Sequence, residues 1–253
     1  MKELFKVHLP ENQTQKDDDY YVRLADYFES AAGGNLDKLR AFTKHVPVAE
    51  ISRFLAKSKL FESVLGIHGS VVECGVFMGG GVMTWASLSA ILEPLNHIRR
   101  IIGFDTFSGF VDVSEEDRSN AANDNLKKGG LKADSYEDLL ECARIFDTYR
   151  PLGHIPKIEL VKGDALETIP AYIEANQHLV VSLLYLDFDL YAPTKAALEA
   201  FLPRMPKGAI VAFDQLGMKQ WPGETRAVME TLGIRNLKLE RFPFQPQISY
   251  AVL

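Results

Sequence analysis

Short apolar runs recur along the chain from residue 71 onward, and each ends in a glycine or a polar residue. Stretches with apolar residues at helical spacing lie between these runs. Strands that are apolar on both faces and alternate with helices are typical of a parallel, doubly wound α/β sheet. The pattern predicts five such strands, at residues 71–75, 101–105, 158–162, 181–187 and 209–214.

The end of the chain has a different pattern. Residues 237–242 alternate between apolar and polar positions, residues 243–247 interrupt, and residues 248–253 are again mostly apolar. Since too few residues separate the two segments for a crossover helix, we expect an antiparallel hairpin. Five parallel strands and a final hairpin resemble the strand inventory of class I methyltransferases, which implies a Rossmann-like seven-stranded sheet of order 3-2-1-4-5-7-6.

Two regions lie outside this regular alternation. Residues 20–65 predict two or three helices, so residues 1–65 are interpreted as an N-terminal helical segment before a methyltransferase domain at 66–253. Residues 111–156 are charged and polar, apart from a helical segment near 136–149. This insertion follows the second strand, on the ligand side of the sheet. It is interpreted either as a helical lid over the site or as an insertion that packs against a partner subunit.

Composition narrows the class of partner. The chain has 253 residues, 47% of them hydrophobic, which is enough for one sizeable core. Its formal net charge of -6 argues against nucleic-acid binding and favours a small-molecule substrate. Residues 1–20, with an acidic run at 17–19 that is interpreted as a solvated turn, are too polar for a signal peptide. Since no apolar run is long enough to span a membrane, we expect a cytoplasmic protein without membrane contact.

Cysteine usage is consistent with that location. Cys74 lies in a run that is predicted to be a buried strand, and Cys142 is the only other cysteine. A disulfide framework is therefore not expected, which indicates a reducing compartment.

The turn after the first predicted strand has the residues expected of a cofactor loop. Glycines let the backbone approach a ligand closely, and the N-terminus of the following helix attracts a carboxylate such as that of S-adenosylmethionine. A nicotinamide dinucleotide would favour Gly-x-Gly-x-x-Gly, whereas the candidate at residues 79–84 ends in threonine. A tight turn without any ligand is the other alternative. The turn has an acid-x-Gly-x-x-x-Gly pattern extended by a further glycine, made by Glu73, Gly75, Gly79 and Gly80.

Two later strand ends predict further cofactor contacts. A bound ribose needs a carboxylate at the end of the second strand, and Asp105 stands there. Asp105 could instead cap a short helix that begins at residues 106–108. Gly163 and Asp164 follow the third strand, where class I methyltransferases usually contact the adenine.

Carboxylates gather at the ends of the fourth and fifth predicted strands. Asp187 and Asp189 end the fourth strand. Asp214 and Gln215 end the fifth. Because neighbouring parallel strands lie roughly 4.8 Å apart, Asp187 and Asp214 can converge on one point. Oxygen ligands without a nearby histidine or cysteine favour a hard cation, Mg²⁺ before Zn²⁺.

Three blocks of residues resemble the macrocin O-methyltransferase family, which methylates sugar hydroxyls on macrolides and related natural products. The blocks lie at 72–80, 103–110 and 187–194, in matching order and spacing. The resemblance implies a homo-oligomer that uses S-adenosylmethionine and Mg²⁺ to methylate a hydroxyl of a sugar or glycosylated metabolite. Together with the strand ends it implies cofactor contacts at Glu73, Gly75, Gly79, Gly80, Asp105, Thr106, Ser108, Gly163, Asp164 and Asp187.

The resemblance also implies a metal site and a mechanism. By position, the family's magnesium ligands correspond to Asp187, Asp214 and Gln215. The family has an aspartate where Gln215 stands, so metal independence stays open as an alternative. The cation would bind the acceptor hydroxyl, lower its pKa and orient it in line with the methyl–sulfonium bond. Asp187 is the predicted catalytic ligand, and Asp189 is a further ligand or the general base.

Several roles have alternatives. If Asp187 and Asp189 both remain extended, their side chains share one face. Asp189 could otherwise cap the next helix or pair with Lys195. His154 could act as a base, although a lone histidine in a loop is more often a surface residue. Trp221 could line an acceptor pocket or anchor its own loop.

Other functions compete with sugar O-methylation. One is a metal-independent methyltransferase that acts on another small-molecule nucleophile. The others are a nicotinamide-dependent oxidoreductase and a non-catalytic nucleotide-binding module. The threonine at the last glycine position and the terminal hairpin argue against the latter two.

Overall fold

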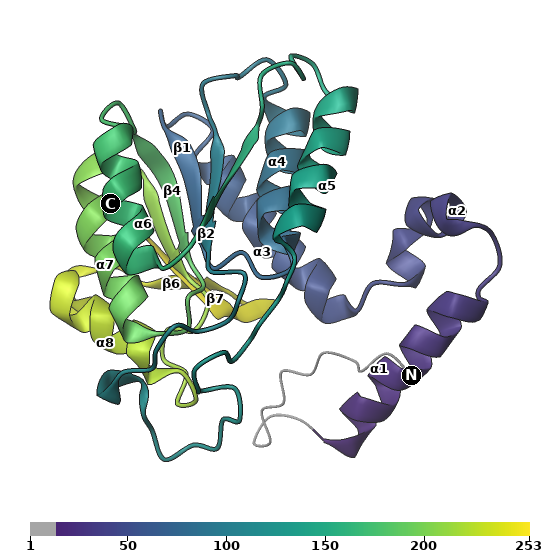
Figure 1. Cartoon of the computed structure of the whole chain (residues 1–253), viewed down its shortest axis with the longest axis horizontal. Helices are drawn as coiled ribbons and strands as arrows, with labels where there is room; N and C mark the ends of the chain where they lie inside the picture. The colour runs from purple at the N-terminus through teal and green to yellow at the C-terminus, as the bar shows by residue number, and fades with distance from the viewer. Residues whose placement is uncertain (1–13) are drawn as a thin grey trace.

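Seven strands form one mixed sheet in the computed structural model, which describes residues 14–253 (Figure 1). The strand order β3-β2-β1-β4-β5-β7-β6 confirms the predicted fold class. The first five strands are parallel, and β7 is antiparallel to both β5 and β6. The bounds are β1 Ser70–Cys74, β2 Ile101–Asp105, β3 Ile158–Lys162, β4 Val181–Leu186, β5 Ile210–Phe213, β6 Glu240–Phe242 and β7 Gln245–Val252.

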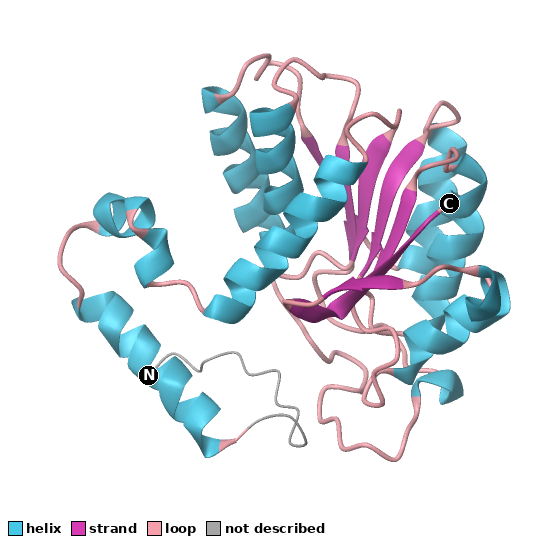
Figure 2. Cartoon of the chain, turned by 180° about the vertical axis from the view of Figure 1, so that it is seen from behind, coloured by secondary structure: helices cyan, strands magenta, loops and turns pink. Residues whose placement is uncertain are grey.

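Helices cover both faces of the sheet (Figures 1 and 2). Val71 is buried in the core beneath α3, α4 and α5, and Val72 in the core beneath α6, α7 and α8, since successive strand residues point to opposite faces. No helix in the described part of the chain is long and apolar enough to cross a membrane. The bounds are α1 Gln15–Ser30, α2 Asn35–Arg40, α3 Val48–Ser63, α4 Gly80–Leu92, α5 Tyr136–Tyr149, α6 Ala165–Ala175, α7 Tyr191–Phe201 and α8 Pro222–Thr231.

The terminal hairpin is confirmed, but its turn is tighter than predicted. Because β7 begins at Gln245, only residues 243–244 separate it from β6, against a predicted interruption at 243–247. The ring of Phe242 stacks on that of Tyr250, with centroids 5.2 Å apart, and Phe242 pairs with Gln245 across the two strands. The pair formed by Phe242 and Gln245 thus carries the strand pairing into the region that appeared irregular in sequence.

The first helices form an arm that projects from the body of the protein (Figures 1 and 2). No residue of α1 is buried. The acidic run at residues 17–19 lies in α1, with Asp17 and Asp18 in its first turn, so its interpretation as a solvated turn was wrong. Asp17 accepts hydrogen bonds from the backbone N–H and the hydroxyl of Thr14, at 2.7 and 2.9 Å, and thereby caps the helix.

The third helix belongs to the core rather than to this arm. Leu60 and Phe61 on α3 are fully buried, and α3 packs against α4 and β7. A domain boundary at residue 65 would therefore separate α3 from α4 and β7, against which it packs. As a result, α3 can present side chains to the same edge of the sheet as the strand ends.

The predicted insertion at residues 111–156 has two parts. Its helix, α5, is the crossover between β2 and β3, with Leu139 buried in the core, so this helix is not part of a lid. Residues 106–135, which we name the strap, cross the carboxyl ends of the strands. Asp117 of the strap is buried and accepts the N–H of Tyr191 on α7 at 2.6 Å. This hydrogen bond attaches the strap to the start of α7 in the same chain.

Candidate active site

A cavity of about 910 Å³ opens at the carboxyl ends of the parallel strands. Open α/β sheets bind ligands at this edge, and the volume suits a cofactor with a small acceptor. The turn after β1, the ends of β2, β4 and β5, the strap and α3 form its walls. The predicted site residues that line it are Glu73, Gly75, Gly80, Asp105, Thr106, Gly163, Asp164, Asp187, Asp189, Asp214 and Gln215.

Two predicted cofactor residues do not line this cavity. Gly79 is the N-cap of α4, and a Cβ there would lie 2.0 Å from the side chain of Leu139. Because Gly79 has no side chain, α4 can pack closely against Leu139 of α5. Ser108 is exposed on the strap, and its N–H donates to the hydroxyl of Thr106 at 3.1 Å in a local turn. The placement does not support a cofactor contact for either residue.

Gly75 lies where the cofactor loop closely approaches the residue after β4. Its φ of +100° is unfavourable for residues with a side chain. A Cβ at this position would lie 2.0 Å from the backbone oxygen of Asp187, whose own N–H donates to the carbonyl of Cys74 at 2.7 Å. The missing side chain thus allows the loop and the end of β4 to meet at the cavity.

Glu73 is a buried carboxylate beneath the start of α4. Lys57 of α3 donates to its Oε1 at 2.9 Å, and a Cβ on Gly81 would lie 1.7 Å from the same oxygen. Burial raises the pKa of Glu73, while the Lys57 ammonium opposes that rise. The other oxygen, Oε2, has no hydrogen-bond partner within residues 14–253. Glu73 therefore belongs to the cavity wall and keeps one buried oxygen unpaired in the described part of the chain.

Asp105 holds the cofactor loop in place. Its Oδ2 accepts the N–H groups of Val76 and Phe77, both at 2.8 Å, and its Oδ1 accepts that of Phe107 at 2.6 Å. No helix begins at residues 106–108, so the predicted alternative of a helix cap was wrong. The contact to a ribose stays a prediction.

Asp187 and Asp214 converge as the strand pairing requires, since they follow the paired residues Leu186 and Phe213. Arg53 of α3 binds Asp214 with both terminal nitrogens, Nη2 to Oδ1 at 2.6 Å and Nη1 to Oδ2 at 3.2 Å. Its Nη2 also lies 3.6 Å from Oδ2 of Asp187. Further polar side chains lie beside these groups, among them Tyr185, Asp189 and Gln215.

The cluster shifts the ionisation of its members. The pKa of Asp187 rises to about 7, mainly because the carboxyl is removed from water and secondly because Asp214 is close, against the opposing effect of Arg53. Burial, reinforced by Asp187, raises the pKa of Asp189 well above its usual range, which favours its acid form at neutral pH. Asp214 raises the pKa of Arg53, so the guanidinium stays charged.

The three predicted metal ligands meet, but their arrangement does not fit a divalent cation. Gln215 directs its amide nitrogen, the donor end, at Asp187 Oδ1 and at Asp214 Oδ2, both at 2.9 Å. The Arg53 guanidinium supplies a positive charge at the same point. Within residues 14–253 no group of three or more His, Cys, Asp or Glu side chains could hold a metal ion.

The model of the family described as macrocin O-methyltransferase (TylF) matches residues 55–237, which is more than half of this chain. The chain belongs to the macrocin O-methyltransferase family. It is therefore an S-adenosylmethionine-dependent O-methyltransferase, which confirms the resemblance seen in the sequence. No curated protein sequence matches it.

Solved structures of other methyltransferases share the fold of this chain. The crystal structure of CalS11, a calicheamicin methyltransferase, is 31% identical with a TM-score of 0.91, over 100% of this chain and 99% of that chain. An apo structure of CalS11, described as a TDP-rhamnose 3'-O-methyltransferase of calicheamicin biosynthesis, is 31% identical with a TM-score of 0.82, over 95% and 96%. The O-methyltransferase NovP, 22% identical with a TM-score of 0.60 over 80% and 79%, is similar in fold.

Asp189 lies in the cavity, but in a different backbone conformation from the one considered in sequence. Its φ of +63° is left-handed, so the chain is not extended from Asp187 to Asp189. Asp117 accepts the first N–H of α7, and Lys195 pairs with Glu230 at 2.7 Å, so Asp189 has neither of the two alternative roles. Strained residues of this kind concentrate at functional sites.

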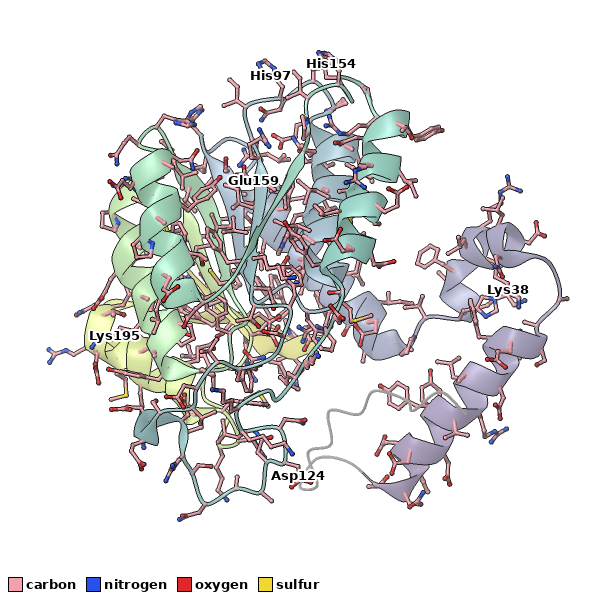
Figure 3. All side chains as sticks on the ribbon, in the orientation of Figure 1. Lys38, His97, Asp124, His154, Glu159 and Lys195 are labelled. Carbon is pink, nitrogen blue, oxygen red and sulfur yellow. The ribbon has the colours of Figure 1, made fainter. Side chains whose placement is uncertain are left out.

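The structure shows where His154 and Trp221 lie relative to the cavity. His154 precedes β3 at the amino end of the sheet, opposite the strap residue Asp124 (Figure 3), so it is a surface residue and not a base. Trp221 is buried and lines the cavity, with its ring 5.9 Å from that of Phe110 on the strap. It therefore both lines the pocket and anchors the strap.

Sequence reasoning missed two cations of the site, Arg53 and Lys57. They are four residues apart on α3 and so lie on one face of the helix. The helix also buries Leu60 and Phe61. Two cations at this spacing on such a helix could have indicated from sequence that both face the interior of the protein. Nothing in the sequence indicated that their partners are Asp214 and Glu73, because these residues lie in other elements of the chain.

Removal of the Asp105 carboxylate should weaken cofactor binding. In Asp105→Ala, two N–H groups of the cofactor loop lose their acceptor, so we expect the affinity for S-adenosylhomocysteine to fall about tenfold or more. Calorimetric titration measures this. Ser108→Ala, at the exposed residue that does not line the cavity, should bind with unchanged affinity. Equal affinity of Asp105→Ala and the parent protein would contradict the role of Asp105.

Proposed function

We propose that the methyltransferase transfers the methyl group of S-adenosylmethionine to a hydroxyl of a sugar on a natural-product intermediate. One observation carries the proposal: a single cavity joins the glycine turn after β1 to the carboxylates at the ends of β4 and β5. Membership of the macrocin O-methyltransferase family supports this acceptor class. So does CalS11, which is described as acting on a nucleotide-linked rhamnose.

The residues of the first half of the cavity suit the cofactor. S-adenosylmethionine supplies a methyl group on a positively charged sulfur. The free N–H groups at the start of α4 suit its carboxylate, and Gly80 adds no side chain at that point. Asp105 fixes the loop, and the free oxygen of Glu73 is an acceptor for a donor group of the cofactor.

The other half suits a sugar. Trp221 and Phe110 present aromatic surface to the cavity, which matches the apolar faces of a sugar ring. Gln245 and Gln247 of β7 line the same region and add amide groups that can donate to or accept from hydroxyls. Asp187, about a quarter of whose side chain is exposed, is the group that we propose accepts the hydroxyl proton. Asp189 would orient the acceptor beside it.

Magnesium assistance, which the family resemblance implied, is not part of this proposal. The donor end of Gln215 and the guanidinium of Arg53 face the two carboxylates that would hold the ion. The homo-oligomer and the cytoplasmic location stay predictions.

Product analysis tests the proposal. The purified chain is incubated with S-adenosylmethionine and, separately, with TDP-rhamnose, a macrolide glycoside and a catechol, and the products are measured by mass spectrometry. We expect a singly methylated sugar and no methylated catechol. Thermal shift should show stabilisation by S-adenosylhomocysteine and none by NADH. Methylation of the catechol alone, or stabilisation by NADH alone, would refute the proposal.

A further inference from the structure

Asp214 has no acceptor capacity left for a metal ion. Its Oδ1 accepts from the hydroxyl of Tyr185 and from Arg53 Nη2, and its Oδ2 accepts from Arg53 Nη1 and Gln215 Nε2. A carboxylate has about four lone-pair sites, so these four hydrogen bonds fill them. A divalent cation would have to displace at least one of these donors.

The bound guanidinium is held firmly in this position. The side chain of Arg53 is 25% exposed and that of Asp214 is 6% exposed, so the pair is largely shielded from water and salt. Two parallel N–H···O bonds between a guanidinium and a carboxylate are among the strong, geometrically specific interactions in proteins. A cation that entered would meet this fixed positive charge at close range, which is unfavourable in a poorly hydrated site.

Asp187 differs from Asp214 because its Oδ2 accepts no hydrogen bond from residues 14–253. Its Oδ1 accepts from Gln215, whereas its Oδ2 lies 3.6 Å from Arg53, beyond hydrogen-bond distance. Asp214 is thus a saturated carboxylate, Asp187 has an oxygen that accepts no hydrogen bond within residues 14–253, and Arg53 is a fixed cation beside both. Asp187 can thus accept a proton, while Arg53 offsets the negative charge of the two carboxylates.

We propose that the Arg53 guanidinium takes the place of a divalent cation, so that methyl transfer by this chain is metal-independent. The inference rests on the proposed function. The acceptor oxygen forms a bond to the methyl carbon, the methyl–sulfur bond breaks with its electron pair on sulfur, and the hydroxyl proton passes to Oδ2 of Asp187. Arg53 keeps its charge throughout and acts as a positioning residue through Asp187 and Asp214.

Metal binding to the full chain tests this without any turnover. The protein is treated with EDTA, dialysed, and titrated calorimetrically with MnCl₂ and with MgCl₂. The variants are Arg53→Met and the double variant Arg53→Met with Gln215→Asp, which removes the guanidinium and adds the carboxylate found in the family. Lys59→Met is the matched control, because Lys59 is on the same helix and pairs with the exposed Glu62, at 3.1 Å, away from the cluster.

We expect no metal site in the parent protein or in Lys59→Met, and one site in the double variant. A saturable site in the parent protein that Asp187→Asn removes would overturn the inference. So would a folded double variant, one that still binds S-adenosylhomocysteine, in which no metal binds, because Arg53 and Gln215 would then not be what excludes the ion.

Turnover supplies a second readout. With EDTA the parent protein should keep its kcat, and Arg53→Met should lose about 100-fold or more in kcat at unchanged cofactor affinity, with partial rescue in Arg53→Lys. Loss of activity in EDTA that Mg²⁺ restores would count against the inference and leave the proposed function standing. A parent protein that does not bind S-adenosylhomocysteine would instead refute the proposed function.

Discussion

Asp187→Ala is expected to lower kcat by about 10³-fold while the affinity for S-adenosylhomocysteine stays nearly unchanged. The substitution removes the carboxylate that faces the acceptor region and has one free oxygen. The contact of residue 187 with the cofactor loop is through its backbone, which donates to Cys74 and approaches Gly75, so it survives the change. Steady-state kinetics and calorimetry on the same preparation measure the two quantities.

Two further variants sharpen this prediction. Asp187→Asn keeps the shape of the side chain but cannot accept the proton, so it should be nearly as slow as Asp187→Ala. Asp112→Asn is the control, since Asp112 also lines the cavity but accepts a local hydrogen bond, from the N–H of Val113 at 2.9 Å. It should retain most of the activity. An Asp187→Asn protein with parental kcat would show that another group takes the proton.

Gly75→Ala should cause the largest loss of stability among the single substitutions considered, about 3 kcal/mol in the free energy of unfolding. The new Cβ would lie 2.0 Å from the backbone oxygen of Asp187 and 3.3 Å from the N atom of Phe188, and φ is +100°. Backbone atoms at the end of β4 cannot move aside as a flexible side chain can. Because the loop must shift, cofactor affinity should fall as well.

Urea unfolding of Gly75→Ala and Gly80→Ala gives a matched comparison. A Cβ on Gly80 would meet no atom within 4 Å, and Gly80 is the first residue of α4. Its replacement should change stability by no more than about 1 kcal/mol, in either direction. If both variants unfold at the same urea concentration, the close approach of the loop to β4 does not limit stability.

The local pattern of the sequence determined the fold and most of the lining of the cavity. Apolar runs predict buried strands, and the carboxyl ends of parallel strands must meet at one edge of the sheet. Asp105, Asp187 and Asp214 could therefore be placed in one site from sequence, because each directly follows or ends a predicted strand. The family blocks depend on the same short-range spacing.

Only the tertiary structure decided what the carboxylates meet. Arg53 and Asp214 are 161 residues apart in the sequence. The periodicity of a helix does not predict which strand end its cations will face. The left-handed turn at Asp189 and the direction of the Gln215 amide also depend on neighbours from several elements. Spacing along the chain fixes which edge a side chain reaches. Packing between distant segments decides which partner that side chain meets. It therefore also decides whether a metal ion or an arginine neutralises a carboxylate at that edge.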